Sequence, residues 1–90
     1  MSTLASRNPQ PVLIELPSNS LGLIRKVPGT LSEAAGKSMI ITSPESIAAS
    51  SAIRVQGKDL LFLGEVVHST PAENGQWSVH MSVKRKFMIF

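Results

Sequence analysis

The alternation of apolar and polar residues divides the chain into short strand-like segments. Residues 12–16 (VLIEL) place Val12, Ile14 and Leu16 on one face, and turn-forming residues follow at 17–20. Residues 31–37 could form one helical turn but are too few to stabilise a helix, so we expect a structured loop there. Other strand-like segments end at a proline, a glycine or a run of small polar residues: 21–27 (before Pro28-Gly29), 38–42, 53–55, 59–68 and 76–84.

The clearest local feature is a hairpin centred on Asn74-Gly75. This dipeptide favours a two-residue type I′ turn, in which both central residues take positive φ. With these two residues as the loop, Met81 would lie opposite His68, and Val83 would lie opposite Val66. The inner face of the hairpin would then be apolar on both strands, with Trp77, Val79, Met81 and Val83 facing Leu60, Phe62, Gly64 and Val66.

The same register places the two histidines on opposite faces of the hairpin. His68 would complete the inner face near the rim, and His80 would be a solvated surface residue. We therefore expect no metal ion shared between them.

The strand pattern predicts an all-β fold, a small antiparallel barrel of about six strands that is closed or nearly closed. The chain has 90 residues, enough for one hydrophobic core. Apolar residues make up 42% of the chain and charged residues 17%, a balance typical of a folded protein rather than a disordered one. We expect residues 1–11 to be a mobile N-terminal arm and residues 12–90 to be a single barrel domain with an apolar C-terminal tail.

The composition argues against catalysis and against a structural metal or cofactor. The chain has no cysteine, which excludes disulfides, thiolate zinc sites and thiol nucleophiles. Two histidines and one aspartate define no Ser-His-Asp arrangement, and no glycine-rich phosphate loop is present. The longest apolar run, residues 60–63, is far too short to cross a bilayer, and the first ten residues do not resemble a signal peptide. We expect a non-enzymatic protein without membrane insertion, located in the cytoplasm.

The net charge of +3 is a mild basic excess. Two interpretations of the basic residues stay open, a solvated face or an anion site, since arginine offers a planar fork to phosphate or guanine. We do not expect nucleic acid as the partner, because one tryptophan and three phenylalanines provide few aromatic rings for base stacking. The basic residues concerned are Arg25, Lys26, Arg54, Lys58, Lys84, Arg85 and Lys86.

Four large apolar residues end the chain directly after a basic triplet: Phe87, Met88, Ile89 and Phe90. A terminus this apolar should be covered. It could complete the last strand, pack across an open barrel end, or contact a protein partner or a second copy of the chain.

The order of these segments and the positions of the turn residues between them resemble the PilZ family from about Arg7 to Val83. The similarity is carried by Gly22-Leu23-Ile24, Ser38-Met39-Ile40-Ile41, Ile53-Arg54-Val55, Leu63-Gly64-Glu65-Val66-Val67 and Gln76-Trp77-Ser78-Val79. The resemblance implies a six-stranded barrel in a bacterial protein. It also implies cyclic di-GMP as a possible ligand, bound through an RxxxR motif before the first strand and a (D/N)xSxxG motif after the second.

Both binding motifs depart from the family pattern. Arg7 stands for the second arginine of RxxxR, but Thr3 occupies the position of the first. Ser32 provides the serine of the second motif, whereas its outer positions hold Thr30 and Ala35. Each missing charge-assisted contact lowers the expected affinity.

The resemblance therefore implies a degenerate member that binds cyclic di-GMP weakly or not at all and acts as a regulatory or interaction module. The alternative is a cyclic di-GMP receptor in which Arg7 and Ser32 bind the ligand, with Arg25 or Lys26 holding phosphate. A small-barrel nucleic-acid binder is the third possibility.

Overall fold

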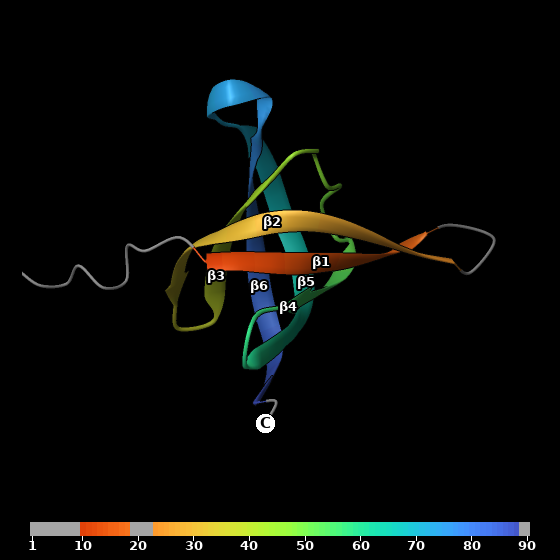
Figure 1. Cartoon of the computed structure of the whole chain (residues 1–90), viewed down its shortest axis with the longest axis vertical. Coiled ribbons are helices and arrows are strands. Elements are labelled where there is room, and N and C mark those ends of the chain that lie inside the picture. The colour runs from red at the N-terminus through yellow and green to blue at the C-terminus, as the bar shows by residue number, and fades with distance from the viewer. Residues whose placement is uncertain (1–9, 19–22, 89–90) are drawn as a thin grey trace, which may run out of the picture.

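The computed structural model describes residues 10–18 and 23–88 of the chain. Neighbouring strands are antiparallel and close into one barrel in the order β1-β2-β3-β6-β5-β4 (Figure 1). The predicted fold class, an all-β antiparallel barrel of six strands, is confirmed. Within the described ranges no helix is long and apolar enough to cross a membrane. The elements are β1 (Gln10–Ser18), β2 (Leu23–Ala35), β3 (Ser38–Ser43), β4 (Ala52–Gln56), β5 (Leu60–Pro71), a 3-10 turn η2 (Glu73–Gly75) and β6 (Trp77–Met88).

One hydrophobic core fills the barrel, because each strand turns every second side chain inward. Val12, Ile14 and Leu16 are buried, as their alternation predicts. Ile14 lies between its Cα partners on the two neighbouring strands, Val27 of β2 and Val55 of β4. The seam between β1 and β4, where the barrel closes, is therefore packed with core side chains. The other buried apolar residues are Met39, Ile41, Ile47, Ile53, Phe62, Val66, Val79 and Met81.

Strand β2 runs through the residues that were expected to end it. The prediction that Pro28-Gly29 terminates this strand is wrong, because β2 continues to Ala35. Pro28 pairs with β1, before the pairing of β2 with β3 begins at Thr30. A proline is tolerated at such an edge, since its missing N–H interrupts no ladder on the unpaired side.

Residues 31–37 form no structured loop, so that prediction is also wrong. Residues 31–35 complete β2 and pair with β3 across a turn at Gly36, whose φ is 60°. A register shift between Leu31 and Glu33 places a bulge at Ser32. The bulge breaks the alternation of inward and outward residues, so the sequence of residues 31–37 does not show the pattern by which a strand is recognised.

The β5–β6 hairpin uses the predicted turn residues. Asn74 and Gly75 both have positive φ, 58° and 73°. The Ala72 N–H donates to the Gln76 carbonyl (2.8 Å), and the Gln76 N–H donates to the Glu73 carbonyl (3.1 Å). The loop thus holds three residues instead of two, which shifts the register by one.

A second irregularity, between Val66 and His68, shifts the register again. The three-residue loop alone already places His68 opposite His80, and beyond the second irregularity Val66 lies opposite Met81. The predicted pairs of Met81 with His68 and of Val83 with Val66 are therefore wrong. The apolar face is nevertheless correct, since Val66 and Met81 are buried and Val83 packs against the core.

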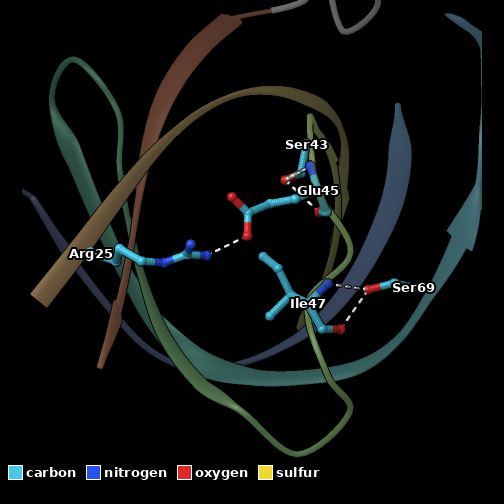
Figure 2. A network of polar contacts seen from close by, with 5 residues as sticks. All are labelled: Arg25, Ser43, Glu45, Ile47 and Ser69. Carbon is cyan, nitrogen blue, oxygen red and sulfur yellow. Dashed lines mark hydrogen bonds and ion pairs between the residues drawn. The ribbon is translucent and has the colours of Figure 1, made fainter. Parts of the chain in front are cut away.

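The connection between β3 and β4, residues 44–51, packs against one end of the barrel. Ile47 enters the core from this connection and is 5% exposed. The Ser69 hydroxyl donates to the Ile47 carbonyl (2.7 Å) and accepts from its N–H (3.2 Å). Arg25 and Glu45 point toward each other and form an ion pair (Figure 2). The opposite end of the barrel holds the start of β1, the β2–β3 turn and the last residues of β6.

Candidate functional site

A hollow of about 450 Å³ lies at the barrel end where β6 terminates. The β2–β3 hairpin forms one wall, and β5 and β6 form the other. Its apolar lining includes Leu31, Leu60, Phe62 and Val83. Its basic lining consists of Lys37, Lys84, Arg85 and Lys86. We call this hollow the end groove.

The end groove combines an apolar floor with a cationic rim. Phe62 is buried, and Leu31, Leu60 and Val83 are partly buried against the core. The four basic side chains are exposed to solvent. None of the described residues that line the groove is acidic. Such a site favours a ligand or partner that has both apolar and anionic groups.

In the wall formed by β5 and β6, one edge of β6 is unpaired. Strand β3 pairs with β6 as far as Ser38 opposite Ser82, and the Val83 N–H then donates to the Lys37 carbonyl (2.7 Å). Beyond this point β6 continues to Met88, paired with β5 from Leu60 onward. Among the described residues, no strand pairs with 84–88 on the other side.

The apolar tail that the sequence singles out as an interaction surface lies partly in this strand. Phe87 pairs with Leu61, Met88 pairs with Leu60, and both tail side chains are exposed, by 42% and 61%. These two residues therefore extend the last strand without burying their side chains. The other two predicted residues, Ile89 and Phe90, lie outside the described residues.

The structure separates the residues predicted for cyclic di-GMP. Ser32 lies at the β2 bulge, where its hydroxyl is 3.0 Å from Oγ1 of Thr42. Arg25 forms its ion pair with Glu45. Lys26 is six residues from Ser32 along an extended strand, a distance of roughly 20 Å. Ser32 thus lies apart from Arg25 and Lys26.

The remaining predicted ligand residue, Arg7, lies outside the described residues. Strand β1 begins at Gln10, two residues before the predicted start, and Gln10 pairs with Leu31. Leu31 is the neighbour of Ser32 in β2.

The two histidines form a stacked pair on the outside of the barrel. The ring centroids of His68 and His80 are 4.2 Å apart, with an interplanar angle of 24°. The prediction that they occupy opposite faces is wrong, because the three-residue loop places them directly opposite each other. His68 is exposed, so the expectation that it completes the inner face is also wrong. In the part of the chain that the structure describes, no three His, Cys, Asp or Glu side chains are grouped to hold a metal.

Lys37 is the groove residue that sequence reasoning misses. It follows Gly36 in the β2–β3 turn, and the hydrogen bond from Val83 to its carbonyl places this turn beside β6. The sequence contains one signal that could have found it. If residues 31–35 are taken as a strand, Gly36-Lys37 becomes a hairpin turn at the end of the barrel where residues 84–86 emerge.

Comparisons with protein-family models, with curated proteins and with solved structures find no match to this chain.

Proposed function

We propose that this chain is a non-enzymatic, PilZ-like regulatory module of a bacterium that binds a protein partner at the end groove. The observation that carries the proposal is the coincidence of an apolar floor, four basic side chains and an exposed strand edge at one end of the barrel. The closed barrel of six antiparallel strands is the architecture that the family resemblance implies. Fold alone does not define a function, so the groove provides the main support.

The groove is better suited to a macromolecular partner than to cyclic di-GMP. Its lining does not contain Ser32, the serine of the second family motif, or Arg25, a candidate for binding the phosphate of cyclic di-GMP. Its basic residues lie beside Phe87 and Met88, two large apolar side chains that are exposed. Aromatic residues, methionine and arginine are enriched at protein interfaces, whereas lysine, which supplies three of the four basic side chains here, is depleted. The exposed Phe87 and Met88, which would become buried on binding, therefore support this part of the proposal.

Partner capture followed by reconstitution tests this function. The tagged chain is used to capture proteins from an extract of its source at 150 mM salt, and the candidate is then purified and bound to the chain directly. We expect the variant Lys84→Glu/Arg85→Glu/Lys86→Glu to lose binding. The control Lys26→Glu changes an exposed basic residue of β2 that does not line the groove and should retain binding. If the groove variant binds the reconstituted partner as tightly as the parent, the proposal is wrong.

A second candidate, a cyclic di-GMP receptor with an altered motif, is favoured by one observation. Gln10, which follows Arg7 by three residues in the sequence, pairs with Leu31, the neighbour of Ser32 in β2. In such a receptor Arg7 and Ser32 would bind the ligand, and the distant Arg25 would not take part.

An amide-resolved NMR titration with cyclic di-GMP separates the two candidates. For the interaction module we expect no saturable shifts at micromolar ligand. Saturable shifts around Ser32 that Arg7→Ala abolishes and Arg25→Ala retains would instead establish the receptor.

A further inference from the structure

We propose that the partner contributes an extended acidic segment, which adds to the barrel as a seventh strand along residues 84–88 of β6. Its apolar side chains would enter the end groove, and its carboxylates would pair with the basic rim. This inference rests on the proposed function and specifies the chemistry and the conformation of the partner.

The first support is the unpaired strand edge. On this side of β6, the backbone hydrogen bond that follows the pairing with β3 is the one from the Val83 N–H to the carbonyl of Lys37 in the β2–β3 turn (2.7 Å). The next five residues of β6 remain extended: Lys84 lies in a bulge without a partner on β5, and residues 85–88 pair with β5 only, among the described residues. An exposed strand edge offers a row of N–H and C=O groups to an incoming strand.

The second support is the groove beside that edge. An added strand directs alternate side chains to the two faces of the sheet. On the inner face these side chains would reach the apolar floor formed by Leu60, Phe62 and Val83. A hollow of about 450 Å³ has room for two or three aliphatic side chains.

The third support is charge, which decides between the possible occupants. Lys37, Lys84, Arg85 and Lys86 surround the groove, and the described lining contains no acid. Two copies of the chain pairing through this edge would bring their 84–86 triplets together, and like charges across paired strands are destabilising. Residues 1–9 of the chain contain Arg7 and no acidic residue, so they do not complement the rim either. An acidic partner segment remains the occupant that matches the site.

The proposal is tested with short synthetic peptides and the full 90-residue chain. The probe is an eight-residue peptide of alternating glutamate and valine, acetylated and amidated at its ends. We expect NMR shifts confined to Lys37, the floor residues Leu60 and Phe62, and residues 83–88, with intermolecular contacts between the peptide backbone and β6. A peptide of alternating lysine and valine should bind at least tenfold more weakly.

Two further comparisons separate strand addition from simple charge attraction. Methylating alternate backbone nitrogens of the glutamate–valine peptide keeps its charge but blocks its main-chain hydrogen bonds, so binding should fall at least tenfold. The chain variant Lys84→Glu/Lys86→Glu should weaken binding by a similar factor, whereas Lys26→Glu, at an exposed position that does not line the groove, should not. The dispersion of the amide spectrum shows whether each variant is folded.

Three outcomes would overturn the proposal: no binding of the glutamate–valine peptide, equal binding of the methylated peptide, or equal binding of the lysine–valine peptide. These failures are distinguishable from failure of the proposed function. If a reconstituted partner still depends on residues 84–86 while the peptides do not bind, the end groove is an interaction site but strand addition is wrong.

Discussion

Gly64 shows how one residue position can determine whether two strands fit together. A Cβ placed on Gly64 would overlap the carbonyl oxygen of Ser82 on β6 and lie 2.9 Å from the terminal methyl of Met81. Backbone atoms in a closed barrel cannot move aside without disturbing the ladder. We expect Gly64→Ala to lower the free energy of unfolding by about 2 to 3 kcal/mol, measured by urea denaturation.

The control for this prediction is Gly57→Ala. A Cβ at Gly57 would lie 3.8 Å from the Leu60 carbonyl oxygen and 3.9 Å from Cγ1 of Val12, which are ordinary contacts. Its effect should stay within about 0.5 kcal/mol. Equal unfolding midpoints for the two variants would show that β5 and β6 are not as close at Gly64 as described.

The ion pair between Arg25 and Glu45 should contribute little to stability despite its close contact. The two side chains are 52% and 42% exposed, so water and salt screen their attraction. We expect Arg25→Gln to change the free energy of unfolding by less than about 0.5 kcal/mol at 150 mM salt. A loss above about 1 kcal/mol in urea denaturation would contradict this prediction.

At the scale of elements, the connection between β3 and β4 depends on one serine of β5. Ser69 satisfies both the N–H and the carbonyl of Ile47, whose side chain is in the core. Buried backbone groups without partners are costly, so Ser69→Ala should lower the free energy of unfolding by about 2 kcal/mol. Amide hydrogen exchange at Ile47 should accelerate as well. Ser46→Ala, at an exposed position of the same connection, should leave both quantities nearly unchanged.

The strands are predictable from the sequence, but their register is not. Alternation identifies Val12, Ile14 and Leu16 as an inward face because each lies two residues from the next. A bulge has no sequence signal of comparable strength. Asn74-Gly75 correctly predicts two residues with positive φ. The hydrogen bond from the Ala72 N–H to the Gln76 carbonyl, however, includes Glu73 in the loop, and the identities of Asn74 and Gly75 do not predict this third residue.

The candidate site is predictable only in part for a related reason. The sequence identifies the basic triplet 84–86 and the exposed residues Phe87 and Met88 as notable. Their combination with Lys37 requires the β2–β3 hairpin, which the bulge at Ser32 conceals. The end groove lies between the β2–β3 and β5–β6 hairpins, so it can be predicted only when the strand register of both hairpins is known.

At the scale of the whole molecule, barrel closure predicts that the chain unfolds as one unit. Every strand has a partner on each side for part of its length, and all six contribute to one core, so opening any seam exposes that core to water. Trp77 is the only tryptophan and begins β6 opposite Ser43 and Pro71, next to the packed connection. We expect urea unfolding followed by Trp77 fluorescence and by far-UV circular dichroism to give the same midpoint. A fluorescence midpoint lower by more than about 0.5 M urea would show that the end of the barrel near residues 44–51 opens separately, and cooperative closure would then be wrong.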